Sequence, residues 1–128
     1  MTDPQTGAPL GENGLLDAET ARTEALAGRL LLVDIRTPME WYRSGVGDAA
    51  EAISMQDPGF LQAVVNKLGG DPSKPLAVIC ATGSRSAWLA GELRRVGFTT
   101  VYDVGEGMMG SFSGPGWLNR QLPTKRPD

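Results

Sequence analysis

Hydrophobic positions along the chain gather in short runs separated by segments of mixed polarity. Continuous apolar runs predict strands at residues 30–35, 52–54, 76–80 and 99–104. The segments before and between these runs predict helices at residues 18–27, 39–43, 59–68 and 87–96. Strands alternating with helices predict an α/β fold, because each helix carries the chain back to start the next parallel strand. We expect a central parallel sheet of about five short strands, flanked by helices on both faces.

Residues with strong turn and capping preferences mark the ends of these elements. Asp17 is a candidate N-cap for the first helix, and Gly28 follows its last turn. Pro38 and Pro58 stand where the second and third helices are expected to begin. At 128 residues the chain is long enough for one domain with a core of its own. We expect a flexible leader at 1–13, a single domain at 14–123 and a tail at 124–128.

Composition and charge narrow the classes of function. The net charge is −3, and the one local basic cluster, Lys125 and Arg126, lies in the predicted tail. This argues against nucleic-acid and anionic-membrane partners, which need clustered cations. No apolar run approaches the ~20 residues of a membrane helix, and the first residues lack the pattern of a secretory signal. A single cysteine excludes an intramolecular disulfide and fits a cytoplasmic protein.

The chain contains no histidine, which removes several kinds of chemistry. Ser-His-Asp and Cys-His catalysis and most zinc sites need an imidazole. We therefore expect no metal site and no cofactor. Catalysis in this chain would depend on sulfur, carboxylates, arginine or backbone dipoles.

The only cysteine, Cys80, stands where a predicted strand ends and a helix is about to begin. A free cysteine at a strand end is often no more than a small buried side chain. The residues that follow favour a nucleophile instead, because small residues let the backbone curl around an anion at a helix N-terminus. Candidate substrate-binding residues are Ala81, Thr82, Gly83, Ser84, Arg85 and Ser86. Among these, Arg85 adds a fixed cation and Ser86 is a candidate helix cap.

Simple magnitudes show that this loop is sufficient to activate a thiol. Lowering a pKa of about 8.5 by two units takes roughly 2.7 kcal/mol. A helix N-terminus supplies about 0.3–2 kcal/mol, and one charge-assisted hydrogen bond about 1.5–3 kcal/mol. The thiolate formed at Cys80 could carry a sulfur atom as a persulfide, or could cleave an anionic ester through a cysteinyl intermediate.

Three segments in order, 31–41, 78–87 and 101–108, resemble the single-domain rhodaneses, a family of sulfurtransferases. The resemblance extends from about Leu15 to Pro123. It implies a rhodanese-like fold, with Cys80 as the persulfide-forming nucleophile, the loop backbone as a cradle, and Arg85 binding an anionic sulfur donor. The implied donor is thiosulfate, a polysulfide or a persulfide, and the implied acceptor is cyanide, a small thiol or a protein thiol.

Two departures and two alternative functions accompany this resemblance. The turn at 44–50 lacks the histidine that many family members carry, and the cradle holds a single cation. One alternative is a non-catalytic sulfur-relay or binding module. The other is a cysteine phosphatase or arsenate-reductase-like enzyme, although four residues separate Cys80 from Arg85 and the phosphatases carry one more. The sequence leaves the donor, the acceptor, the pathway and the oligomeric state open.

Charged residues near the first strand have two interpretations. Asp34 and Arg36 are candidates for the rim of the site, because the carboxyl ends of parallel strands share one edge of the sheet. Arg36 and Glu40 are also spaced for an i, i+4 ion pair, which is the commoner role. We expect that pair, with Asp34 anchoring loop N–H groups.

The remaining aromatic and sulfur side chains fit structural roles. We expect Trp88 and Trp41 in the core, Trp117 packed at the surface, and Met108 and Met109 filling space under the last turn. The segment 105–110 matches the dinucleotide pattern G-x-G-x-x-G. Too few residues follow it to complete a nucleotide-binding unit, so a tight turn is the better interpretation.

Overall fold

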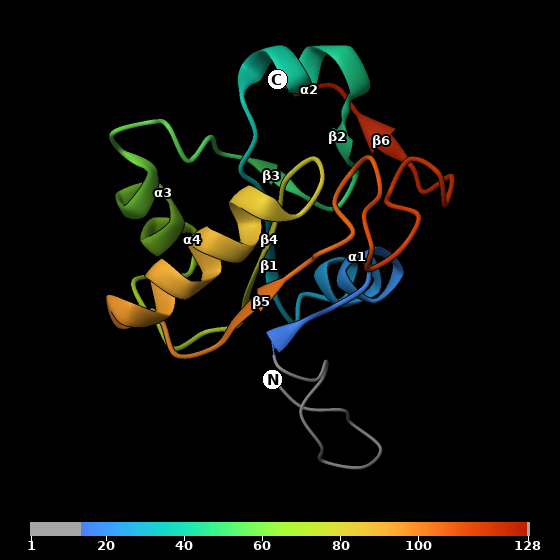
Figure 1. The fold of residues 1–128 in the computed structure, drawn as a ribbon. Coiled ribbons are helices and arrows are strands. Elements are labelled where there is room, and N and C mark those ends of the chain that lie inside the picture. Colours follow the sequence, from blue (N-terminus) through green and yellow to red (C-terminus); the bar gives the residue numbers. More distant parts are fainter. Residues whose placement is uncertain (1–13, 128) are drawn as a thin grey trace.

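The computed structural model describes residues 14–127, so the predicted leader at 1–13 lies outside the described residues. Helices and strands alternate along most of the chain (Figure 1). The helices are α1 (Ala18–Leu26), α2 (Pro38–Ser44), α3 (Phe60–Lys67) and α4 (Ser84–Arg95). The strands are β1 (Leu31–Asp34), β2 (Val46–Gly47), β3 (Glu51–Ala52), β4 (Leu76–Ile79), β5 (Val101–Asp103) and β6 (Thr124–Lys125).

The central sheet is parallel, as the sequence predicts, with the strand order β3-β1-β4-β5. It has four strands rather than about five. The remaining two strands form a separate antiparallel ribbon, in which Val46 pairs with Lys125 and Gly47 with Thr124. Part of the segment predicted as a tail is therefore a strand. The first strand of this ribbon follows α2 directly, so the ribbon anchors the far end of the chain beside α2 (Figure 1).

Local capping explains where the first helices begin. Asp17 is the N-cap of α1, as predicted, and its carboxylate accepts a hydrogen bond from the Thr20 amide at 2.7 Å. Thr37 and Glu40 form a capping box that starts α2, with Pro38 in its first turn. The predicted strand at 52–54 is shorter and earlier than expected, covering only Glu51 and Ala52.

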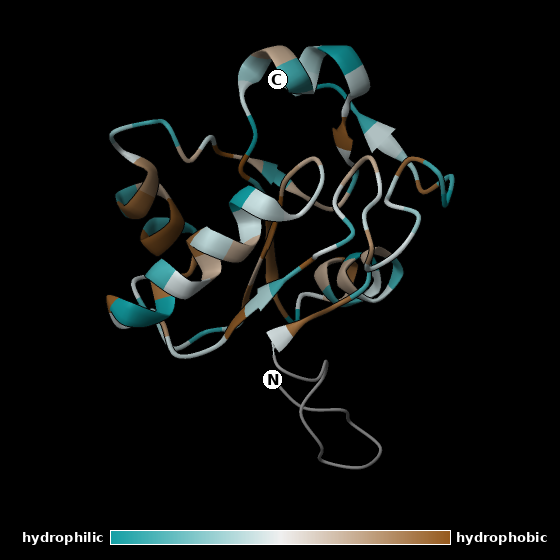
Figure 2. Ribbon diagram, viewed as in Figure 1, coloured by the Kyte–Doolittle hydropathy of each residue, from teal (hydrophilic) through white to brown (hydrophobic). Residues whose placement is uncertain are grey.

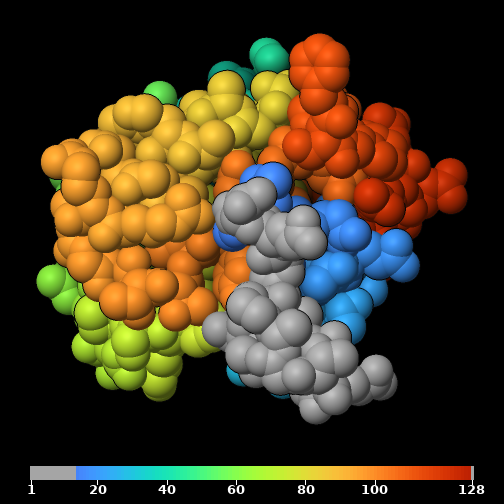
Figure 3. Space-filling model, turned by 60° about the horizontal axis from the view of Figure 1, so that its bottom comes forward, coloured from blue at the N-terminus to red at the C-terminus, as the bar shows by residue number. Residues whose placement is uncertain are grey.

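The core lies on both faces of the sheet. One face packs against α1 and the segment after β5, through residues such as Ala21, Met108 and Trp117. The other face packs against α3 and α4, and Cys80 belongs to this second cluster. Figure 2 shows the apolar residues concentrated in the central strands and in α3. In the space-filling view, α4 (yellow to orange) and α1 (blue) form opposite sides of the molecule (Figure 3).

The structure corrects three of the structural roles expected for large side chains. Trp117 is fully buried rather than at the surface, because its ring packs directly on Gly47, where no Cβ intervenes. Trp88 is 61% exposed rather than in the core, since it projects from the solvent side of α4. Met109 is also exposed, whereas Met108 is buried as expected.

The glycine-rich segment after β5 is a turn, as the sequence indicates, and it is held by a buried carboxylate. Glu106 accepts hydrogen bonds from the amides of Ala18 and Gly116 at 2.8 and 2.7 Å and from the Arg120 side chain at 2.7 Å. It thereby ties this turn to the start of α1 and to the C-terminal segment. None of the helices described within residues 14–127 has the length and apolar character needed to cross a membrane.

Candidate active site

The candidate site forms where β4 passes into α4. β4 ends at Ile79, Cys80 follows, and α4 begins at Ser84, three residues earlier than the sequence predicts. Gly83 is the residue before the helix, with a φ of 95° that favours glycine. Ser86 therefore lies within the first turn and is not the cap. The short loop brings the N-terminus of α4, with its free N–H groups, directly over the end of β4.

The sulfur of Cys80 faces polar groups of this loop. The amides of Gly83 and Ser86 donate hydrogen bonds to Sγ at 3.1 and 3.4 Å, and the Ser86 hydroxyl lies 3.4 Å from Sγ. Two N–H donors and the positive end of a helix dipole are thus directed at the sulfur. Cys80 itself has no exposed surface. The sulfur therefore lies covered beneath the loop, with these donors directed at it.

The turn after β5 holds the loop closed over Cys80. The amides of Met108 and Met109 donate to the carbonyl oxygens of Cys80 and Ala81 at 2.9 and 2.8 Å. At Gly107, with a φ of 68°, a Cβ atom would lie 2.2 Å from the Ala81 carbonyl oxygen. This glycine therefore permits the two backbones to approach each other. The sequence marks the turn, but does not reveal that it packs on the sulfur loop.

Replacing Gly107 with alanine should displace the sulfur loop. The new methyl group would collide with the Ala81 backbone and loosen the cover over Cys80, so we expect faster alkylation of Cys80 together with lower stability. Gly28→Ala is the matched control, because Gly28 has a φ of 75° but a methyl group added there would meet nothing within 4 Å. Both variants should lose stability by thermal denaturation, and only Gly107→Ala should change the reaction of Cys80. Equal reactivity in the two variants would contradict the role assigned to this turn.

Arg85 is joined to α2 through a two-pronged ion pair with Glu40. Its two terminal nitrogens donate to the Glu40 carboxylate at 2.7 and 2.8 Å. The hydrogen bonds from Arg85, aided by the Thr37 amide and opposed by burial, lower the pKa of Glu40 to about 2. The pair thus persists at every pH above about 2, and its stabilising effect is lost only as the pH falls from about 4.5 toward 2.

Arg36 and Asp34 form a buried ion pair with each other, so the expected pair of Arg36 with Glu40 is wrong. The Arg36 guanidinium donates to both oxygens of Asp34 at 2.8–3.1 Å and also to the Ser44 hydroxyl and the Gly45 carbonyl. The side chains of Arg36 and Asp34 are 1% and 0% exposed. The groups that Arg36 contacts lie at the end of β1 and at the end of α2. The buried pair therefore holds the end of α2 against β1.

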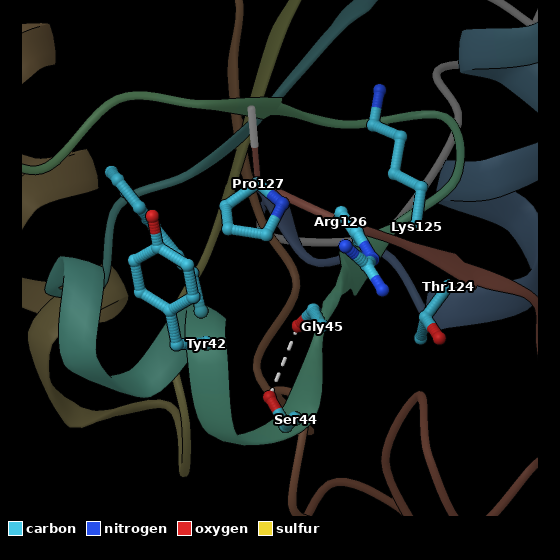
Figure 4. A pocket seen from close by; sticks show the side chains of 8 residues that line it. Tyr42, Ser44, Gly45, Thr124, Lys125, Arg126 and Pro127 are labelled. Carbon is cyan, nitrogen blue, oxygen red and sulfur yellow. Dashed lines mark hydrogen bonds between the residues drawn. The ribbon is translucent and has the colours of Figure 1, made fainter.

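A large cavity lies elsewhere in the structure. It has a volume of about 750 Å³ and opens between the end of α2 and the β6 segment, where Tyr42, Gly45 and Arg126 line it (Figure 4). No residue between Cys80 and Ser86 borders this cavity. A smaller open hollow of about 450 Å³ borders the sulfur loop, lined by Thr82, Ser111 and Phe112, and Cys80 does not line it.

A comparison with protein families matches residues 17–111 to the rhodanese-like domain. This chain belongs to the rhodanese-like domain family. A solved rhodanese-like relative, the polysulfide-sulfur transferase homodimer from Wolinella succinogenes, is 31% identical, with a TM-score of 0.66 over 88% of this chain and 77% of that chain. The human single-domain sulfurtransferase is 19% identical, with a TM-score of 0.57 over 73% of this chain and 90% of that one, and shows the fold alone. An uncharacterized protein from Rickettsia prowazekii is 25% identical over an alignment of 108 positions, which covers 77% of this chain and 85% of that protein.

Within this rhodanese-like domain, the residues proposed from the sequence separate into two groups. Gly83 and Ser86 contact the sulfur of Cys80 and Arg85 pairs with Glu40, whereas the Asp34–Arg36 pair lies in the interior beneath α2. Sequence reasoning missed Glu40 as the partner of Arg85, because the i, i+4 spacing pointed to Arg36.

Proposed function

We propose that this protein is a sulfurtransferase that carries sulfane sulfur as a persulfide on Cys80. The observation that carries the proposal is the pair of amide N–H groups, from Gly83 and Ser86, that point at Sγ. Such donors stabilise an anionic sulfur and need no metal, cofactor or histidine. A lone cysteine that must stay reduced suits the cytoplasm.

The proposed reaction has two balanced steps. The Cys80 thiolate attacks the outer sulfur of an anionic donor, a new S–S bond forms, and the donor's own bond to that sulfur breaks with the electron pair leaving on the departing group. A nucleophilic thiol or cyanide then attacks the outer sulfur of the persulfide, and the electron pair of the S–S bond returns to Cys80. No oxidant or reductant is consumed, because the sulfur moves between nucleophiles.

The closed site sets a condition on the donor. Arg85 is the cation of the sulfur loop, and Glu40 occupies it. An anionic donor therefore has to replace Glu40 at Arg85 before its outer sulfur meets Cys80. The likeness to the polysulfide-sulfur transferase supports a polysulfide or persulfide as the donor class. The loop, with four residues between Cys80 and Arg85, supports sulfur rather than a phosphoryl group as the cargo.

Arg85→Ala should weaken donor use. Losing one charge-assisted hydrogen bond of about 1.5–3 kcal/mol corresponds to a fall of about 10- to 150-fold in kcat/KM for the anionic donor. The measurement is steady-state kinetics with the donor varied. Arg95→Ala is the control, because Arg95 lies at the far end of α4 and pairs with Glu92 on the surface. Equal kinetics in the two variants would make Arg85 a scaffold residue.

Glu40→Gln should act in the opposite direction. It removes the anion that competes with the donor while keeping the shape of the side chain. We expect a lower KM for an anionic donor, with the effect fading at high salt because the attraction is electrostatic. An unchanged or higher KM would show that Glu40 positions Arg85 for the donor and does not compete with it.

A sulfur-relay module is the second candidate function, and the complete burial of Cys80 favours it. In that case a protein partner would open the loop, and small acceptors would react slowly. Rapid sulfur exchange with one protein thiol, together with slow turnover of cyanide and small thiols, would select the relay. Hydrolysis of an aryl phosphate that depends on Cys80 would instead support a phosphatase.

A further inference from the structure

The cavity between α2 and β6 has no part in the proposed sulfur chemistry. Its volume of about 750 Å³ is within the range of sites that hold small organic molecules. Its lining comes from two segments far apart along the chain, the end of α2 and residues 124–127. The basic pair that the sequence marks near its end, Lys125 and Arg126, therefore lies on a cavity wall.

The α2 wall of this cavity is fixed from behind by the interior of the protein. The buried Arg36 guanidinium donates to the Ser44 hydroxyl and to the Gly45 carbonyl oxygen, both at 2.9 Å. The Trp41 indole N–H donates to the Asp34 carboxylate at 3.2 Å. This wall is in place before a ligand arrives, so binding does not pay to order it.

Backbone pairing holds the opposite wall. β6 is paired with β2 in the antiparallel ribbon. Gly45, with a φ of 79°, lets the two walls meet closely, because a Cβ atom there would lie 3.1 Å from the Thr124 Cβ. Figure 4 shows the Tyr42 ring on the α2 side and Thr124, Lys125 and Arg126 on the β6 side.

The cations of this cavity have no acid to neutralise them. Both Lys125 and Arg126 are exposed, and no salt bridge within residues 14–127 joins either of them to a carboxylate. None of the described residues that line the cavity is acidic. A second basic hollow, beside the start of β4, differs in this respect, since its Arg29 and Lys67 are paired with glutamates. The α2–β6 cavity therefore presents positive charge to an anion.

The donors around the cavity match a phosphate group. The Arg126 guanidinium is a planar fork of N–H donors, and the Lys125 ammonium adds a point charge. The hydroxyls of Tyr42 and Thr124 line the same cavity, and neither has a hydrogen-bond partner in the described part of the chain. A phosphate monoester brings nearly two negative charges and three acceptor oxygens. These oxygens suit four donor groups better than the two oxygens of a carboxylate.

The rest of the cavity suits a flat ring. A lone phosphate would leave most of the volume of about 750 Å³ empty. The walls beside the donors include the indole of Trp41, the ring of Tyr42, which is 77% exposed, and Pro127. Planar molecules stack on such surfaces.

We propose that this cavity binds a small phosphate monoester of a planar ring compound. The phosphate contacts Lys125 and Arg126, and the ring lies against Tyr42. The inference is independent of the proposed function, because no residue between Cys80 and Ser86 borders the cavity.

The experiment is isothermal titration calorimetry of the full chain at low salt with AMP and with phenylphosphonate, whose P–C bond resists hydrolysis. Adenosine and phenol carry the rings without the anion, and inorganic phosphate carries the anion without a ring. We expect AMP, phenylphosphonate or both to bind at least about tenfold more tightly than any of these three, and high salt to weaken the binding. If neither binds more tightly than these partial probes, the proposal is overturned.

Variants place the bound anion. Arg126→Gln should weaken binding about tenfold or more, as expected for the loss of one charge-assisted hydrogen bond, and Lys125→Gln gives a second variant should the first not fold. Tyr42→Ala should weaken it about two- to tenfold by removing the ring. Lys74→Gln is the matched control, because it makes the same change in net charge at the other basic hollow, and it should not change binding.

Arg85→Ala separates this cavity from the sulfur loop, whose cation also attracts anions. It should leave the binding of AMP and phenylphosphonate unchanged. Loss of binding in Arg85→Ala but not in Arg126→Gln would place the anion at the sulfur loop and overturn the proposal. Equal binding by Arg126→Gln and Lys74→Gln would overturn it as well. Calorimetry involves no sulfur transfer, so binding at this cavity by a protein that accepts no sulfane sulfur would reject the proposed function and retain this inference.

Discussion

Replacing Cys80 with serine is expected to abolish sulfur transfer. Serine keeps the size of the side chain and the hydrogen bonds from the Gly83 and Ser86 amides, so the fold should be retained. Its hydroxyl does not ionise in the accessible pH range and forms no bond to sulfane sulfur. The measurement is formation of the sulfurated acceptor, thiocyanate from cyanide, with thiosulfate, polysulfide and a small persulfide each tested as donor.

The single cysteine provides a chemical control for this substitution. Native protein blocked at Cys80 by iodoacetamide should be as inactive as Cys80→Ser, and thermal denaturation should show that the variant is folded. Sulfur transfer by the variant above the background rate would show that another group carries the sulfur. That result would contradict the proposed function.

Breaking the buried pair of Arg36 and Asp34 is expected to have the largest effect on stability. Arg36→Ala leaves the Asp34 charge buried without its partner, which typically destabilises a protein by about 3–5 kcal/mol. That is a large part of the total stability of a small domain, about 5–15 kcal/mol. The measurement is the free energy of unfolding from urea denaturation.

A partly exposed ion pair supplies the control. Arg22 and Asp48 are 27% and 25% exposed, and Arg22→Ala should cost only about 0–1 kcal/mol. A double variant, Asp34→Asn with Arg36→Met, should recover part of the loss because neither buried charge remains. If Arg36→Ala costs no more than Arg22→Ala, the buried pair does not brace α2.

The order of elements and the place of the sulfur follow from local patterns in the sequence. The apolar runs at β1 and β4 mark covered parallel strands, and Asp17, Pro38 and Gly28 mark helix ends. Cys80 is identified because strand end, small-residue loop and helix start are neighbours along the chain. Each of these inferences needs only residues a few positions apart, for which periodicity and capping chemistry are informative.

The details that the sequence did not predict depend on residues far apart along the chain. Glu40 and Arg85 are 45 positions apart, and the choice of Asp34 over Glu40 as the partner of Arg36 depends on how α2 packs on β1. Trp117 is buried because Gly47 leaves room for its ring. The burial of Cys80 likewise depends on the turn after β5, which lies beyond the next helix and strand. Tertiary packing decides such contacts, and spacing alone does not contain them.

The central claim is that Cys80 bears a transferable sulfur atom, and intact-protein mass spectrometry tests it most directly. Native protein is treated with a sulfane-sulfur donor, and the excess donor is then removed. The protein should have gained the mass of one sulfur atom. Peptide mapping should place that mass on Cys80, and a thiol or cyanide should remove it. A protein that gains no mass with thiosulfate, polysulfide or a small persulfide, or that gains it in Cys80→Ser as well, would contradict this claim.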